Sequence, residues 1–166
     1  MDLPMGGVVA ANIAFWALVH TATGFYVHGL PPERLDRDGW LHRPLRVEAG
    51  GRLYERLRIR RWKDRLPEAG ALFAGGVSKR HLPSAAVGGL GRFVVETRRA
   101  ELGHWLALVP GPLAVLWNPP VGAAAMVAYG VLVNLPFIAV QRFNRQRAQR
   151  VLERSNGSRS DGPRRR

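Results

Sequence analysis

A carboxylate and an imidazole lie one helical turn apart in residues 96–105, which read ETRRAELGHW. On a helix, residues three and four apart share a face, so Thr97, Glu101 and His104 form one polar stripe. A carboxylate beside an imidazole can orient the ring and stabilise its protonated form, as in catalytic triads. The spacing therefore indicates general-base chemistry, with His104 as the base and Glu101 as its orienting group.

A second histidine follows two cations in the run Lys79-Arg80-His81. His81 is the reserve candidate for the base. Lys79 and Arg80 could hold the phosphates of a donor such as coenzyme A as point charges, and Arg98 and Arg99 could do the same. Arg98 can also pair with the carboxylate three residues later. A phosphate-cradling Walker loop is absent, because no Gly-Lys-Ser/Thr follows the glycines of this region.

Polar residues also follow one stripe near the C-terminus. Asn134, Gln141 and Arg145 are separated by seven and four residues, so they fall on one helix face that we expect to contact protein or a polar cavity rather than lipid. Asn134, Gln141 or Asn144 could donate hydrogen bonds to an oxyanion. We predict no metal site, because a Glu-x-x-His pair of the di-iron type requires a second copy, and the chain has no cysteine.

Three apolar stretches must position these groups. Residues 3–27 carry no charge, residues 102–117 form a shorter apolar run interrupted by prolines, and residues 121–140 form a full-length one. About 20 apolar residues cross a bilayer as a helix. The sequence therefore predicts an all-α integral membrane protein with about three transmembrane helices, the last two joined as a hairpin by Asn118-Pro119-Pro120.

The first stretch could also be a signal peptide. Its acidic start, Met1-Asp2, and the lack of a clear cleavage site favour a retained helix. Asn12 and His20 are polar residues within it, and we expect them to form hydrogen bonds with neighbouring helices.

The placement of charge supports the membrane interpretation. The chain carries 25 Lys and Arg residues and a formal net charge of +13, yet none of these cations lies in residues 1–33 or 100–141. Nucleic-acid binding requires no such gaps, whereas the positive-inside rule predicts them. We therefore expect a multi-pass protein of the cell (cytoplasmic) membrane. The basic loop 31–101 and the C-terminus would be cytoplasmic, and no nucleic acid would be bound.

The remaining organisation is simple. Residues 1–154 are expected to form a single membrane domain, and residues 155–166 a disordered basic tail, because the tail is polar and rich in Gly and Ser. Within the basic loop, residues 51–70 place aromatic and aliphatic anchors among cations, which is typical of a segment lying at lipid headgroups. Its spacing does not separate helix from strand.

Several of these motifs together resemble a known family. They are Arg61-Trp62-Lys63-Asp64, Lys79-Arg80-His81-Leu82, the ETRRAELGHW segment at 96–105, and NLPFIAVQRFNRQR at 134–147. In type and order they are similar to the glycosyl-4,4'-diaponeurosporenoate acyltransferases of staphyloxanthin-type carotenoid biosynthesis. The chain departs from that pattern in being rich in Arg, Gly and Ala and in carrying the polar tail.

The resemblance implies a bacterial membrane acyltransferase. Its reaction would esterify a sugar hydroxyl of a glycosylated carotenoid, or of a related glycolipid, with a fatty acyl group. The co-substrate would be an acyl-CoA or an acyl-carrier protein, with no bound cofactor and with membrane lipid as the surroundings. The chain has no cysteine and no GxSxG motif, so direct transfer without a covalent enzyme intermediate is the simpler mechanism.

Two other interpretations remain open at this stage. The first is a small non-catalytic membrane scaffold or assembly subunit, in which Glu–Arg pairs join helices where they meet the headgroups. The second is a polybasic protein that binds anionic lipid or nucleic acid. The oligomeric state is unknown.

Overall fold

The computed structural model describes residues 3–66 and 87–160, and every regular element in these ranges is a helix, as the sequence predicts. In chain order the elements are α1 (Met5–His28), η1 (Pro32–Leu35), η2 (Arg46–Gly51), α2 (Arg52–Arg56), α3 (Ile59–Trp62), η3 (Lys63–Arg65), α4 (Val87–Leu108), η5 (Gly111–Leu116) and α5 (Pro120–Ser160), where η denotes a 3-10 helix.

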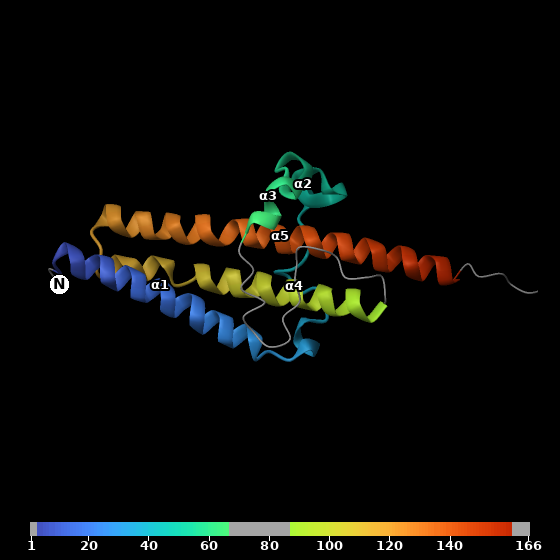
Figure 1. Cartoon of the computed structure of the whole chain (residues 1–166), viewed down its shortest axis with the longest axis horizontal. Coiled ribbons are helices and arrows are strands. Elements are labelled where there is room, and N and C mark those ends of the chain that lie inside the picture. The colour runs from blue at the N-terminus through green and yellow to red at the C-terminus, as the bar shows by residue number, and fades with distance from the viewer. Residues whose placement is uncertain (1–2, 67–86, 161–166) are drawn as a thin grey trace, which may run out of the picture.

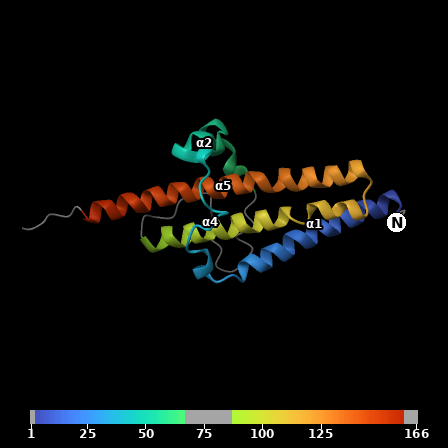
Figure 2. The ribbon, with the colours of Figure 1, turned by 180° about the vertical axis from the view of Figure 1, so that it is seen from behind.

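Three long helical segments lie side by side and form the body of the molecule (Figure 1). α4, continued by η5, runs antiparallel to α5, and α1 packs against α4. The view from behind shows the same order, with α2 and α3 on the side of α5 away from α1 (Figure 2). The contact between α4 and α5 is the most extensive in the fold, and we call this interface the seam.

Two helices are long and apolar enough to cross a membrane, namely α1 and the first part of α5. α1 has 24 residues, which at about 1.5 Å per residue exceeds the roughly 30 Å of a hydrocarbon core. Only 11% of its apolar window is buried within the protein, so most of its side chains face outward. Prolines at 31 and 32 and a turn at Gly29 end the helix where the charged chain begins.

The third predicted span, residues 102–117, does not form a single helix. α4 ends at Leu108, and the chain resumes as η5. Pro110 and Pro112 lack backbone N–H groups, so α-helical hydrogen bonding cannot continue through them. The break that these prolines predict is therefore confirmed. By length and hydropathy, two described helices rather than three qualify as spans.

α5 is much longer than the predicted span 121–140. It passes through Pro136 and continues as an unbroken helix into the basic C-terminal region. Residues 155–160, predicted to begin a disordered tail, are the last turns of this helix, and residues 161–166 lie outside the described residues. One helix thus connects the apolar end of the molecule to its charged end.

The basic connection folds back onto α5 through a small apolar cluster. Tyr54 of α2 and Ile59 of α3 are buried against Val140 and Phe143 of α5. Between the two short helices, Arg58 takes a left-handed backbone conformation (φ 49°), which allows the sharp change of direction. The segment whose spacing left helix and strand open is therefore helical, and it is anchored where the apolar part of α5 ends.

Trp16 locks α1 against the other two helices. The indole is 5% exposed and packs with Val19 of its own helix and Ala107 of α4. Its edge also lies directly against Gly130 of α5, where a Cβ would be only 2.5 Å from Cη2 of the ring. Because His20 and Tyr129 also contact the indole, the ring cannot move aside easily.

We therefore predict opposite effects for two glycine substitutions within helices. Gly91→Ala in α4 should be neutral or stabilising, since its Cβ meets no described residue within 4 Å and alanine gains about 0.8–1 kcal/mol of helix propensity. Gly130→Ala should destabilise the protein by about 1–3 kcal/mol through overpacking, despite the same gain. Thermal unfolding in detergent micelles measures both variants. A Gly130→Ala protein as stable as Gly91→Ala would contradict the packing of Trp16.

Candidate functional site

The polar side chains singled out in the sequence gather along the seam. In the part of the chain that the structure describes, the buried polar residues of α4 are Thr97, Arg98 and Glu101, and those of α5 are Asn134, Gln141, Arg142, Asn144 and Arg145. The predicted stripes on the two helices therefore face each other. They form two groups, a charged cluster and a histidine–amide pair.

Glu101 is the centre of the charged cluster and is fully buried (0% exposed). Arg142 Nη1 donates to its Oε1 at 2.6 Å, and Arg145 Nη1 donates to its Oε2 at 2.5 Å. The indole N–H of Trp105 makes a longer contact of 3.3 Å to Oε1. The carboxylate that was expected to orient His104 thus binds two arginines of the opposite helix.

The same two arginines hold the connection between η1 and α2. Arg142 forms a bidentate pair with Glu48 of η2, at 2.7 and 3.0 Å. Arg142 also donates to the carbonyls of Leu41 and Arg43, and Arg145 donates to the carbonyl of His42. Three consecutive carbonyls are therefore bound by guanidinium groups, whose fixed planar geometry suits such multiple contacts.

Burial and nearby charges set the protonation states of His42 and Glu48 in this connection. Burial lowers the pKa of His42, and this effect exceeds the opposite influence of Glu101, so the imidazole is neutral at neutral pH. Burial alone would raise the pKa of Glu48, but hydrogen bonds from Arg142 and from the backbone amide of Leu45 bring it below its ordinary value. Two carboxylates thus balance two guanidinium groups, with a neutral imidazole beside them.

His104 belongs to the second group, where its partner is Asn134 rather than Glu101. Its Nδ1 lies 2.9 Å from Asn134 Oδ1, and its ring stacks on Phe137 with the centroids 4.8 Å apart. The orientation of the amide is fixed because Asn134 Nδ2 donates to the carbonyl of Gly130 at 2.9 Å. The imidazole therefore carries its hydrogen on Nδ1 and its lone pair on Nε2.

A half-buried imidazole with a fixed tautomer has the properties of a general base. Asn134 is fully buried, so the group that sets the tautomer is itself held rigidly. The sequence placed both residues in the candidate site but did not pair them with each other.

Arg98 and Arg99 do not reach this pair. Arg98 binds Asp38 and the carbonyls of Leu35 and Asp36. Arg99 pairs with Glu96 and donates to three carbonyls at the end of α1. Both side chains bind the connection that follows α1, so each has a structural role. The predicted pairing of Arg98 with Glu101 is wrong, since Asp38 takes that place.

The other predicted site residues divide between the seam and the undescribed segment. Gln141 and Asn144 are buried in α5, and Gln141 Oε1 has no hydrogen-bond partner among the described residues. Lys79, Arg80 and His81 lie outside the described residues. Reasoning from the sequence missed Asp38, His42 and Glu48. No local signal singled out the two carboxylates, because residues 31–48 contain as many acidic residues as arginines.

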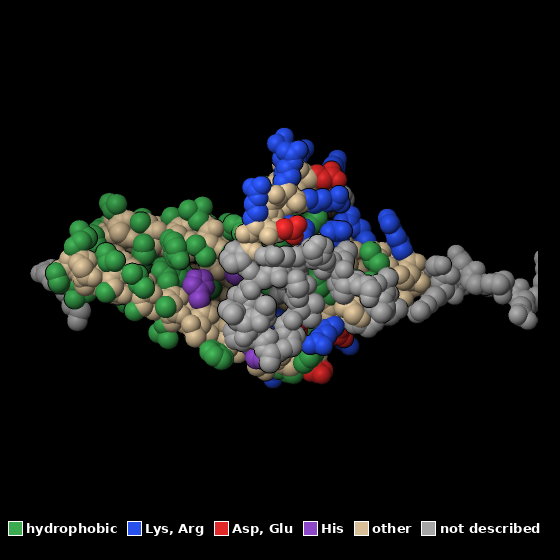
Figure 3. All heavy atoms as spheres, in the orientation of Figure 1, with side chains coloured by type: hydrophobic (Ala, Val, Ile, Leu, Met, Phe, Trp, Pro, Cys, Tyr) green, Lys and Arg blue, Asp and Glu red, His purple; other side chains and the backbone are tan. Residues whose placement is uncertain are grey.

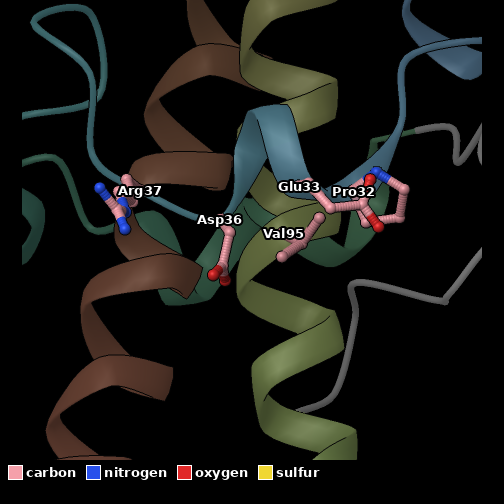
Figure 4. Close-up of a pocket in the computed structure, with 5 residues that line it drawn as sticks. All are labelled: Pro32, Glu33, Asp36, Arg37 and Val95. Atoms are coloured by element: carbon pink, nitrogen blue, oxygen red, sulfur yellow. The ribbon is translucent and has the colours of Figure 1, made fainter.

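An open hollow lies beside η1, away from both polar groups. It is lined by Pro32, Glu33, Asp36, Arg37 and Val95 (Figure 4). None of these residues belongs to the charged cluster or the His104–Asn134 pair, and the two acids beside one arginine do not form an anion site. We therefore assign the chemistry to the seam.

The fold and the seam define a class of protein. In its described residues it is a small helical protein, with two helices long and apolar enough to cross a membrane and a partly buried histidine–amide pair between its antiparallel helices.

Comparison with known proteins identifies the family within that class. The glycosyl-4,4'-diaponeurosporenoate acyltransferase family model matches residues 37–154, so the chain belongs to this family and is an acyltransferase.

Named relatives in Staphylococcus aureus carry the same description. The enzyme of strain MRSA252 is 25% identical over 152 residues, which cover 89% of this chain and 90% of the relative. The enzyme of strain USA300 is 30% identical over 107 residues, or 62% of this chain and 63% of the relative. No solved structure matches the chain.

Removing the charge of Glu101 tests the structural role of the charged cluster. Glu101→Gln should cost about 3–5 kcal/mol of stability, because it leaves a buried guanidinium without its counter-ion. Glu96→Gln is the matched control, since Glu96 forms a more exposed pair with Arg99 that should contribute no more than about 1 kcal/mol. Thermal unfolding and the yield of monodisperse protein in detergent measure the difference. Equal stability of the two variants would contradict the role given to Glu101.

Proposed function

We propose that this acyltransferase esterifies a sugar hydroxyl of a glycosylated carotenoid, or of a related glycolipid, with a fatty acyl group, and that it works in the cytoplasmic membrane. The observation that carries the proposal is the His104–Asn134 pair, a base with a fixed tautomer in a chain of this family. The names of the relatives supply the acceptor class, a glycosylated carotenoid acid.

Surface chemistry supports the membrane location. Apolar side chains cover the end of the molecule formed by α1, η5 and the start of α5, whereas the cations gather around the middle, over α2 and α3, and in the adjoining half (Figure 3). The outward-facing apolar side chains include Val9, Ile13, Leu18, Val121 and Leu132. Soluble monomers rarely expose an apolar surface of this extent, whereas the surface of a membrane-spanning helix is normally of this kind.

The chemistry requires a proton to leave the sugar hydroxyl as it attacks the acyl carbonyl carbon. His104 Nε2 accepts that proton, and the electron pair of the carbonyl moves onto its oxygen. When the carbonyl reforms, the carbon–sulfur bond of the thioester breaks, and the thiolate takes the proton back from His104. Asn134 holds the ring and stabilises the imidazolium through the Nδ1–H hydrogen bond.

The donor would be a fatty acyl-CoA or an acyl-carrier protein, both of which carry anionic phosphate. Arg98 and Arg99 are engaged within the protein, so other cations must attract this charge. The exposed arginines of α2 and α3 lie at the end of the apolar part of α5, where a donor would meet the membrane. They are Arg52, Arg56, Arg58, Arg60 and Arg61.

We predict that His104→Ala lowers the turnover number by about two to four orders of magnitude, because a general base contributes on that scale. Asn134→Leu should also lower kcat, with little change in KM, since it removes the orienting group but leaves the binding surface intact. The measurement is ester formation per mole of purified protein from an acyl thioester and a glycosylated carotenoid.

His28→Ala is the matched control for this experiment. His28 is exposed at the end of α1 and should have no effect on turnover. Near-normal turnover in His104→Ala together with complete loss in His81→Ala would move the base to the basic loop. A wild-type protein inactive with both donor types would support a scaffold role.

Topology supplies an independent prediction for the membrane location. The chain has no cysteine, so single cysteines can be introduced without background. An impermeant maleimide should label Val121→Cys, beside the turn before α5, in intact cells. It should label Arg60→Cys, in α3, only after permeabilisation, because basic segments remain on the cytoplasmic side. The opposite pattern would invert the proposed orientation.

A further inference from the structure

One face of α1 carries three polar aromatic or amide side chains at intervals of one helical turn, namely Asn12, Trp16 and His20. Asn12 has a full set of partners. Its Nδ2 donates to Asn118 Oδ1, and its Oδ1 accepts from Asn118 Nδ2 and Trp117 Nε1, all at 2.8–2.9 Å. The expectation that polar groups of this helix bind neighbouring elements is therefore met at Asn12.

Trp16 and His20 differ from Asn12. Trp16 Nε1 and His20 Nε2 are both buried, and neither has a hydrogen-bond partner in the part of the chain that is described. Their rings stack, with the centroids 5.7 Å apart and an interplanar angle of 29°. A buried donor or acceptor left without a partner costs about 1–3 kcal/mol, so two such nitrogens side by side call for an explanation beyond packing.

Their location relates them to the proposed base. The Trp16 ring lies against Gly130, the residue whose carbonyl accepts the Asn134 amide. Asn134 in turn holds His104. Trp16 and the His104–Asn134 pair therefore meet the same turn of α5, residues 130–134, and His20 is stacked on Trp16. This turn lies in the apolar half of the molecule, where a hydrogen bond is electrostatically stronger than in water.

Acyl transfer requires hydrogen-bond donors close to the carbonyl oxygen of the thioester. The attack of the hydroxyl on the thioester places negative charge on the carbonyl oxygen, and N–H groups aimed at that oxygen lower the barrier most when they are fixed in a site of low dielectric constant. In the tautomer with hydrogen on Nε2, His20 is a donor, and an indole N–H is a donor only.

We propose that Trp16 Nε1–H and His20 Nε2–H donate hydrogen bonds to the carbonyl oxygen of the fatty acyl thioester and stabilise the oxyanion formed during transfer. This inference rests on the proposed function and deepens it, because it assigns the acyl carbonyl to α1 and the hydroxyl proton to the seam. The acyl chain would then extend along the apolar surfaces of α1 and α5.

Conservative variants test the proposal. His20→Phe keeps an aromatic ring in place and removes the nitrogens, whereas Trp16→Phe removes the N–H together with one ring of the buried indole. Each should lower kcat by about 10²–10³-fold, with the KM for the donor within about threefold of wild type. His20→Phe should not lower the melting temperature, since losing an unpaired buried polar group removes a cost, but Trp16→Phe should lower it, because it leaves a cavity against Gly130. Unchanged stability with lost turnover in His20→Phe is not expected of a residue that only packs.

Trp117→Phe is the matched control. It also removes one indole N–H, but that group is bonded to Asn12. This variant should lower the melting temperature and keep its turnover number. The proposal is overturned if kcat in Trp16→Phe and His20→Phe stays within about twofold of wild type. It is also overturned if His20→Phe unfolds while Trp117→Phe remains stable.

A binding experiment separates this proposal from the proposed function. Indole ¹⁵N–¹H signals of the full chain are recorded in micelles, with the Trp16 signal identified by its loss in Trp16→Phe. Palmitoyl-CoA without any acceptor should move the Trp16 proton downfield, whereas S-hexadecyl-CoA, which lacks the carbonyl, should not. Equal shifts with both probes, or none, would exclude a carbonyl contact. If the wild type acylates no glycosylated carotenoid but the selective shift is seen, only the acceptor assignment fails.

Discussion

The buried carboxylate of Glu101 is the constraint on which the rest of the structure depends. A carboxylate removed from water is stable only if ion pairs and hydrogen bonds replace its hydration. Arg142 and Arg145 supply these, and each then uses its remaining N–H groups on the connection after η1, at the carbonyls of residues 41–43. One ion therefore determines how α4, α5 and the basic connection fit together.

The ion pairs of Glu101 also set the register of α4 against α5, and with it the position of the His104–Asn134 pair. α4 and α5 are antiparallel, so moving inward from the Glu101–Arg142 contact advances along α4 and goes back along α5. His104 is one turn from Glu101, whereas Asn134 is about two turns from Arg142. The long arginine side chain spans the extra turn, and the imidazole and the amide are in contact. A slip of one turn would separate them and leave a buried guanidinium unpaired. The ion pairs thus specify the position of a site that they do not touch.

The sequence predicted the helical class, the proline break after α4 and the polar stripes on α4 and α5, and two of its three predicted spans qualify by length and hydropathy. These follow from local periodicity and from the residues that end helices. It did not predict which stripe residues pair. Glu101 lies near both His104 and Arg98 along the chain, and a local argument pairs it with them. In the fold Glu101 binds two arginines more than 40 residues away in sequence. Tertiary packing, which brings α5 against α4, determines these partners. Glu48 and His42 were missed for the same reason.

The arrangement of polar groups along the molecule matches the shape of an amphiphilic substrate. Along α5 the apolar turns come first, Asn134 with its partner His104 comes next, and Arg142 and Arg145 of the charged cluster follow. A glycosylated lipid at a membrane surface has the same order, with sugar outside, ester linkage at the boundary and chain inside. An enzyme that forms an ester at that boundary must hold its base at the same depth in the membrane as the reacting hydroxyl. Because the register that the ion pairs set also fixes the depth of His104, the catalysis proposed for this histidine depends on the charged cluster through geometry rather than through contact with the substrate.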